Sequence, residues 1–93
     1  MIFAVFATLK PDHQQEAFLE KSKKWWDTDR PPTLTFRSAF SVIGAVPDLY
    51  ILETDNQADL HSLVHYWPEF DFVIHPAYDL LDHYRRQGMK IPD

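Results

Sequence analysis

The sequence predicts an α+β domain in which a four-stranded antiparallel sheet is covered on one face by two helices. This prediction rests on the order of the segments and on their apolar periodicities, which are about 2 residues for strands and 3.6 residues for helices. The segments are a strand at Ile2–Leu9, a helix at Pro11–Trp26, strands at Thr33–Ile43 and Leu49–Thr54, a helix at Asn56–Tyr66 and a strand at Phe70–Tyr78. This β-α-β-β-α-β order is that of ferredoxin-like domains, and we expect one domain over residues 1–93.

The first strand indicates that the sheet has a partner on its second face. Ile2, Phe3, Val5 and Phe6 place bulky apolar groups on both sides of this strand. Two helices can cover only one face of a four-stranded sheet, so the other face requires a second cover. Small domains also bury too little surface to be very stable alone. We therefore expect a homodimer.

The first helix should end in two tryptophans with different environments. Pro11 supplies a helical φ at its start. At 100° per residue, Phe18 and Trp25 share the apolar side, whereas Trp26 lies well off it. We expect Trp25 in the core or in a cavity wall, and Trp26 at a rim or an interface. The helix cannot continue through Asp27–Pro32, because two successive prolines remove amide donors.

Alternation assigns the two faces of the second and third strands. One face of the second strand carries Leu34, Phe36, Phe40 and Val42, and the other carries Thr33, Thr35, Arg37 and Ser41. In the third strand one face carries Leu49, Ile51 and Glu53, and the other carries Tyr50, Leu52 and Thr54. The residues from Gly44 to Asp48 are expected to form the turn between these strands.

The second half of the chain has equally clear start and stop signals. Asn56 or Asp55 caps the second helix. The apolar stripe of this helix is Leu60, Leu63, Val64 and Trp67. In the last strand, Phe70, Phe72, Ile74 and Pro76 alternate with Asp71, Val73, His75 and Ala77. A charged tail from Asp79 to Gln87 is predicted to form a short helix that Gly88 ends.

Charge and composition exclude several functional classes. The formal net charge of −5 argues against a nucleic acid or an anionic membrane as partner. The sequence has no cysteine, which excludes a thiol nucleophile and thiolate metal ligands and fits a reducing compartment. The opening apolar run is too short for a signal peptide or a membrane span, so we expect a cytoplasmic protein. There is no glycine-rich phosphate loop or HExxH motif, and no cofactor is expected.

Two histidines on the second helix raise the question of a metal site. His61 and His65 are four residues apart, which lets two imidazoles reach one ion. Both lie about 100–150° away from the apolar stripe, and no third ligand is obvious nearby. We therefore expect solvated histidines and no metal, with His65 near enough to Tyr66 and Trp67 to reach a pocket rim.

Polar side chains that interrupt apolar strands mark the candidate catalytic residues. His75 stands in the last strand with Asp71 on the same face, and Arg37 and Glu53 interrupt the second and third strands. A histidine can act as general acid or base, a carboxylate can orient it, and an arginine can hold an anion or a developing oxyanion. The alternative is a structural Arg–carboxylate pair with a satisfied edge histidine.

Aromatic residues make up 15% of the chain and gather near the ends of both predicted helices. Most of them are expected in the core. They can also wall a cavity that holds a flat apolar ligand, the second interpretation. The candidate substrate-binding residues are therefore Arg37, Glu53, Trp25, His65, Trp67 and Tyr78.

Four stretches of the chain resemble the dimeric α+β barrel superfamily. They are Met1–Val5, Leu9–His13, Tyr50–Asp55 and Trp67–Phe72. The nearest likeness is to small muconolactone-isomerase-like proteins, including an uncharacterised group. The resemblance implies that two monomers associate sheet against sheet with their helices outside. The superfamily includes muconolactone isomerases, cofactor-independent monooxygenases, polyketide cyclases, haem-degrading monooxygenases and members without known activity.

The resemblance also suggests roles for single residues. Polyketide cyclases of this superfamily use a histidine base, and His75 is the residue that could serve here. Haem-degrading members pair a strand-one asparagine with a tryptophan and a histidine. This chain has Trp67 and His75, but Ala7 and Thr8 stand where that asparagine would fall.

Two functional hypotheses follow. The first is a small cofactor-independent enzyme that acts on a cyclic or aromatic metabolite by isomerase- or cyclase-like acid–base chemistry. In it, His75 and Asp71 are catalytic and Arg37 anchors an anionic group. The second is a non-catalytic dimeric module whose aromatic pocket binds a small molecule. A cofactor-independent monooxygenase is a further alternative.

Overall fold

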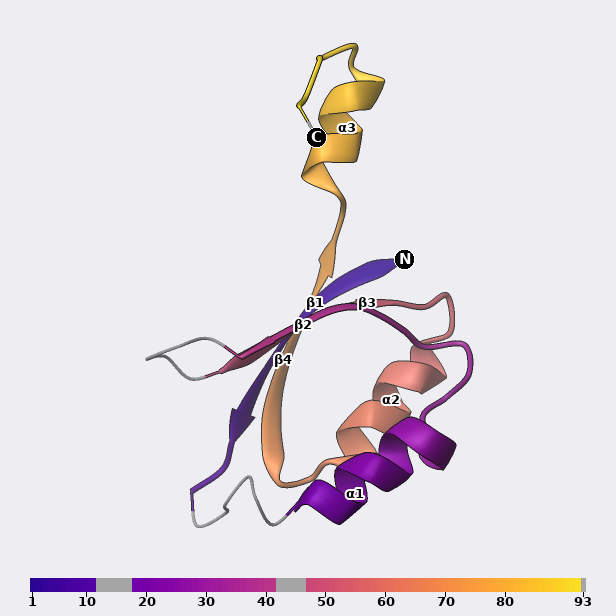
Figure 1. Ribbon diagram of the computed structural model, residues 1–93, viewed down its shortest axis with the longest axis vertical. Helices are drawn as coiled ribbons and strands as arrows, with labels where there is room; N and C mark the ends of the chain where they lie inside the picture. The colour runs from indigo at the N-terminus through magenta and orange to yellow at the C-terminus, as the bar shows by residue number, and fades with distance from the viewer. Residues whose placement is uncertain (12–17, 42–46, 93) are drawn as a thin grey trace.

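The computed structural model describes residues 1–11, 18–41 and 47–92, and there it has a four-stranded antiparallel sheet with helices on one face (Figure 1). The strands are β1 (Ile2–Leu9), β2 (Thr35–Ser41), β3 (Asp48–Glu53) and β4 (Phe70–Ala77). The helices are α1 (Leu19–Lys24), the π-helical turn η2 (Trp25–Asp29), α2 (Gln57–Tyr66) and α3 (Leu80–Arg86). The sheet order is β2-β3-β1-β4. The predicted ferredoxin-like β-α-β-β-α-β fold is confirmed.

The two faces of the sheet have different surroundings. Phe3, Val5 and Ala7 of β1 are buried against the helices, and we call this side the helix face. The register places Val5 opposite Tyr50 of β3 and Ile74 of β4, so these strands present their own alternate residues to the same side. The core joins this face to the helices through Trp25, Leu34, Leu52, Leu63 and Trp67.

We call the opposite side of the sheet the open face. In the ladder pairs, Phe6 lies opposite Leu49 and Val73, and Leu49 in turn lies opposite Phe40. These four residues form an apolar row across all the strands of the sheet. Phe40 is 57% exposed and Val73 is 51% exposed, because within the described residues no helix covers this side.

The alternation predicted for β2 is wrong after Phe36, because the strand contains a β-bulge. The register shifts between Phe36 and Ser38, so Arg37 is an extra residue without an opposite partner in β3. An extra residue reverses the side to which later residues point. Phe36 therefore lies at the helix face, but Phe40 lies on the open face rather than beside it. The predicted continuation of this strand through Val42 and Ile43 lies outside the described residues.

The first helix differs from its prediction at its end. Residues 12–17 lie outside the description, and α1 covers Leu19–Lys24. Helical backbone then continues as η2 through Asp29 instead of ending at Trp26, and it stops at Arg30, whose ψ of 130° is extended. Pro31 follows directly, in keeping with the predicted effect of the prolines.

The second helix is capped as predicted, with one exception in its apolar stripe. The Asn56 side chain accepts a hydrogen bond from the amide of Ala58 at 3.1 Å. Leu63 and Trp67 are buried, but Val64 is 40% exposed. Val64 therefore lies at the edge of the stripe, outside the contact with the sheet.

The C-terminal helix α3 projects beyond the end of β4, away from the rest of the domain (Figure 1). Asp79 caps it by accepting a hydrogen bond from the amide of Asp82, and Gly88 follows it with a φ of 85°. This is the left-handed conformation in which glycine commonly ends helices. No helix in the described part of the chain is long and apolar enough to cross a membrane.

Candidate ligand-binding site

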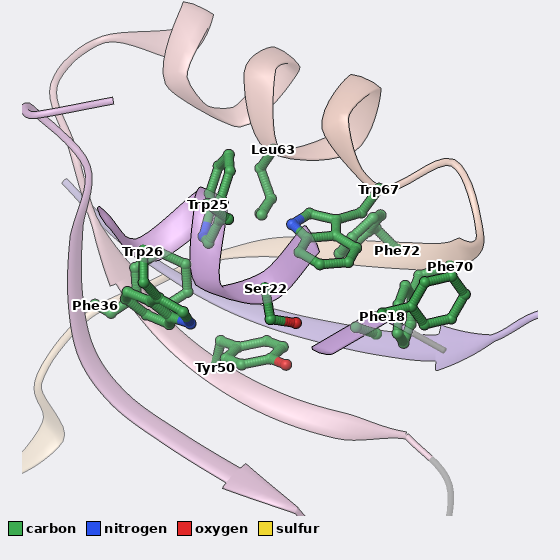
Figure 2. A pocket seen from close by; sticks show the side chains of 11 residues that line it. Phe18, Ser22, Trp25, Trp26, Phe36, Tyr50, Leu63, Trp67, Phe70 and Phe72 are labelled. Carbon is green, nitrogen blue, oxygen red and sulfur yellow. The ribbon is translucent and has the colours of Figure 1, made fainter. Parts of the chain in front are cut away.

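A cavity of about 120 Å³ lies between the helix face of the sheet and the helices (Figure 2). Its walls are mostly aromatic and come from every layer of the domain. The residues that matter most below are Ser22, Trp25, Trp26, Phe36, Tyr50 and Trp67. Figure 2 shows their side chains turned toward one space, with Ser22 of α1 above Tyr50 of β3.

The π-helical turn η2 supplies two consecutive tryptophans to the cavity. The amide of Arg30 donates to the carbonyl of Trp25 at 2.8 Å, five residues back, which is the hydrogen bond that defines a π-turn. Trp25 is only 2% exposed, whereas Trp26 is 47% exposed and lies at the rim. The environments predicted for both residues are confirmed. Turns of this kind are frequent at functional sites.

Aromatic contacts hold the walls of the cavity in place. The rings of Trp26 and Phe36 meet edge to face with centroids 4.7 Å apart, and those of Phe36 and Tyr50 lie 5.8 Å apart. On the other side, Trp25 and Trp67 are 6.4 Å apart. Such pairs contribute beyond the area they bury, so the space is bounded by side chains that restrain one another.

Charged groups contact the outer side of these walls. Lys21 pairs with Glu69 at 2.6 Å, and its ammonium lies 4.9 Å from the centre of the Trp67 ring. The hydroxyl of Tyr66 donates to Asp29 at 2.9 Å. Burial of its ring and this hydrogen bond raise the pKa of Tyr66 above its ordinary value. The hydroxyl therefore remains a donor at neutral pH.

Five polar groups line the cavity without a hydrogen-bond partner among the described residues. They are the indole N–H groups of Trp25, Trp26 and Trp67 and the hydroxyls of Ser22 and Tyr50. Figure 2 shows the indole nitrogens turned toward the middle of the space. Burial, and secondly the carboxylate of Asp48, raise the pKa of Tyr50, so its hydroxyl stays protonated.

A family model described as a domain of unknown function, DUF3303, matches residues 1–85. The chain belongs to this family. The match covers all the strands and every residue that lines the cavity. No curated protein matches the DUF3303 chain.

The DUF3303 fold divides the predicted site residues between the two faces of the sheet. Trp25 and Trp67 line the cavity, as the binding hypothesis expected. His75 and Asp71 lie on the open face, where His75 is opposite Ala4. The sheet therefore separates His75 from the aromatic cavity, and the two do not form one site.

The expected contact between Asp71 and His75 is absent from the described part of the structure. Val73 stands between them on the strand, and the Asp71 carboxylate lies 3.9 Å from the ammonium of Lys10 instead. Four residues of a strand span about 13 Å, which is too far for a carboxylate to orient an imidazole. No hydrogen bond of the His75 ring is formed within the described residues.

The other predicted residues also lie outside the cavity of the DUF3303 domain. Arg37 pairs loosely with Glu53, with Nε 3.9 Å from Oε1, and both side chains are partly exposed. Together with Tyr78 they border an open hollow between the sheet and α3. His65 is exposed on the outside of α2, where its ring stacks on that of His61 at 6.2 Å. Within the described residues, no three His, Cys, Asp or Glu side chains cluster as metal ligands would.

The sequence did not single out Ser22, Trp26, Phe36 or Tyr50 as parts of one site. Only Trp26 carried a signal, because its position off the apolar stripe predicted a rim. Ser22 lies one turn before Trp25 and Trp26, and Tyr50 shares a strand face with Leu52. That spacing could have placed each on the inner side of its element, but not within reach of the others.

Proposed function

We propose that this protein binds a small cyclic or aromatic metabolite in the aromatic cavity. The observation that best supports this proposal is the cavity itself, a preformed space bounded by Trp25, Trp67 and Tyr50. Small-molecule sites are typically concave and mostly apolar, with a few polar groups that orient the ligand. This proposal develops the binding-module hypothesis.

A purified sample tests this function directly. Native mass spectrometry should show the protein with a small molecule attached, and denaturation should release it for identification. Ser22→Leu places a larger side chain in the cavity and should abolish the adduct. Ser62→Leu makes the same change on the exposed side of α2 and should keep it. Equal loading of both variants, each shown to be folded, would contradict the proposal.

A second candidate is acid–base chemistry on the open face, the isomerase- or cyclase-like hypothesis. One observation favours it: His75 is set among the apolar residues of that face, opposite Ala4 and beside the row that contains Phe6. A cover over this face would enclose the imidazole. His75→Ala should then abolish turnover while leaving ligand binding in the aromatic cavity unchanged.

We propose further that a second copy of the chain covers the open face. The apolar row of Phe6, Phe40, Leu49 and Val73 supports this assembly, as does the resemblance to dimeric α+β barrels. An antiparallel sheet tolerates one solvated face when that face is polar, whereas this face carries an apolar row across all four strands. At opposite corners, Arg37–Glu53 and Lys10–Asp71 place both signs of charge around the row.

A further inference from the structure

The aromatic cavity has more hydrogen-bond donors than its own residues use. Trp25 and Trp67 are 2% and 9% exposed, yet within the described residues neither indole N–H has an acceptor. Neither indole nitrogen is fully enclosed, so each N–H meets the open space of the cavity. An indole N–H can only donate, so its partner must bring an acceptor atom into the cavity.

The hydroxyls on the opposite side add to the same set of donors. Figure 2 shows Ser22 directly above Tyr50 with both oxygens pointing the same way, and within the described residues neither hydroxyl has a hydrogen-bond partner. The raised pKa of Tyr50 keeps its proton in place. A single acceptor oxygen with two lone pairs could therefore take up donors from the tryptophan side and from the hydroxyl side.

The size of the cavity limits the ligand to about one ring. Its volume is about 120 Å³. Since an apolar protein cavity of about 150 Å³ admits benzene, this space takes one ring at most, and a substituent on that ring must extend toward the exposed rim at Trp26. The edge-to-face contacts of Trp26, Phe36 and Tyr50 fix the walls, so a second fused ring would have to displace restrained side chains.

The charge of the cavity disfavours an ionised ligand. None of the described residues that line it is charged. The carboxylate of Asp48 acts on Tyr50, while Lys21 and Arg30 lie over the rings of Trp67 and Trp26, 4.9 and 5.5 Å from the ring centres, so charges of both signs surround the cavity but, in the described part of the chain, none lines it. Burial of an unpaired ligand charge would be costly, whereas a neutral acceptor would meet ready donors.

We propose that the ligand is an uncharged single-ring compound that carries a carbonyl or similar acceptor oxygen. The oxygen accepts one hydrogen bond from the tryptophan side, where Trp25 and Trp67 offer indole N–H groups, and one from the hydroxyl side, where Ser22 and Tyr50 offer O–H groups. The ring stacks within the aromatic walls. This inference rests on the proposed ligand-binding function and specifies its chemical class.

Acetophenone and three related molecules test the proposal, because each of the three differs from acetophenone mainly in one property. Acetophenone is neutral, single-ringed and bears a carbonyl; ethylbenzene lacks the acceptor, benzoate is charged and 2-acetonaphthone has two rings. Titrations followed by two-dimensional NMR of the 15N-labelled full chain report on the three indole N–H signals, one per tryptophan. We expect acetophenone to bind and to move at least two of these signals downfield. The other three should bind about tenfold more weakly.

Conservative variants connect the binding to the donors. Ser22→Ala and Tyr50→Phe each remove one hydroxyl and should weaken acetophenone binding about three- to tenfold, while ethylbenzene binding stays unchanged. Tyr84→Phe removes a hydroxyl from α3, outside the cavity, and should bind acetophenone like the wild type. The amide spectrum of each variant reports whether it is folded.

The possible results separate this inference from the proposed function. If ethylbenzene, benzoate or 2-acetonaphthone binds as tightly as acetophenone, the ligand class is wrong but ligand binding stands. Wild-type affinity in folded Ser22→Ala and Tyr50→Phe would also overturn the role of the donors. If none of the four probes shifts an indole signal and no small molecule co-purifies, both the inference and the proposed function fail.

Discussion

At the scale of single residues, a buried carboxylate joins three parts of the fold. Asp59 is 4% exposed and accepts hydrogen bonds from the hydroxyls of Thr33 and Thr54, both at 2.6 Å. Thr54 follows β3, Asp59 is in the first turn of α2, and Thr33 precedes β2. Since buried acids are tolerated only when hydrogen-bonded, these contacts fix how α2 starts relative to the sheet.

Replacement of this carboxylate should destabilise the protein. Asp59→Ala removes the shorter of the two acceptor contacts of the buried Thr54 hydroxyl, leaving only the Asn56 carbonyl at 3.3 Å, and should lower the free energy of unfolding by about 1–3 kcal/mol in urea denaturation. Asp27→Ala, at an exposed position of η2, should change it by less than about 0.5 kcal/mol. Equal effects of the two substitutions would contradict the structural role of Asp59.

The tyrosines of the cavity region predict how stability depends on alkaline pH. The folded protein raises the pKa of Tyr50 above its ordinary 10.0, so in the unfolded chain this hydroxyl ionises first. The contribution of Tyr50 to stability is therefore full below about pH 10 and is lost as pH rises through the folded pKa. Urea denaturation at pH 9, 10 and 11 should show this loss, and Tyr50→Phe should reduce it. An identical alkaline loss in Tyr50→Phe would show that burial of this hydroxyl is not responsible.

At the scale of elements, one ion pair holds α1 against the start of β4. Lys21 of α1 reaches Glu69 at 2.6 Å, and both side chains are partly buried. The same ammonium lies over the Trp67 ring, so this contact also positions a cavity wall. The neighbouring pair of Lys23 and Glu20, at 3.8 Å, is far more exposed.

These two pairs should differ in their effect on stability. Lys21→Ala leaves the Glu69 carboxylate partly buried and should cost about 1–2 kcal/mol, whereas Lys23→Ala should cost less than about 0.5 kcal/mol. Chemical denaturation of Lys21→Ala, Glu69→Gln and the double variant gives the coupling energy. A coupling energy near zero would mean that Lys21 acts through packing on Trp67 alone.

At the scale of the whole molecule, the chain is more extended than a compact domain of its length. Its radius of gyration is 15.3 Å, against about 12 Å expected for 93 residues. The projecting helix α3 contributes to this extension (Figure 1), and it leaves Leu80 and Leu81 about half exposed. Together with the open face, this apolar surface is unfavourable for an isolated monomer.

The proposed dimer gives a direct prediction at this scale. Sedimentation at micromolar concentration should return a mass near twice 11.0 kDa. Val73→Glu places a charge within the apolar row of the open face and should shift the protein toward monomer. Val64→Glu makes the same change on the exposed side of α2 and should leave the dimer intact. A folded wild-type monomer at this concentration would refute the dimer.

The sequence by itself determined the order of elements, their types and most of the residue sets that share one face of an element. Strand alternation placed Phe70, Phe72 and Ile74 together, and the position of Trp25 on its helix placed it inside. These are local properties, because each depends on the period of one element against a single apolar layer. The same reasoning placed the cap of the second helix at Asn56 or Asp55, and the structure shows Asn56 in this role, where its side chain bonds an amide only two residues away.

Only the tertiary structure decided which side chains meet. The bulge at Arg37 moved Phe40 to the open face, and the thickness of the sheet separated His75 from Trp67. The cavity itself depends on how far α1 and α2 stand from the strands, a distance set by packing between elements that are remote in sequence. Ser22 and Tyr50 could not be paired from their own segments, because periodicity specifies a direction within one element and carries no information about what lies opposite.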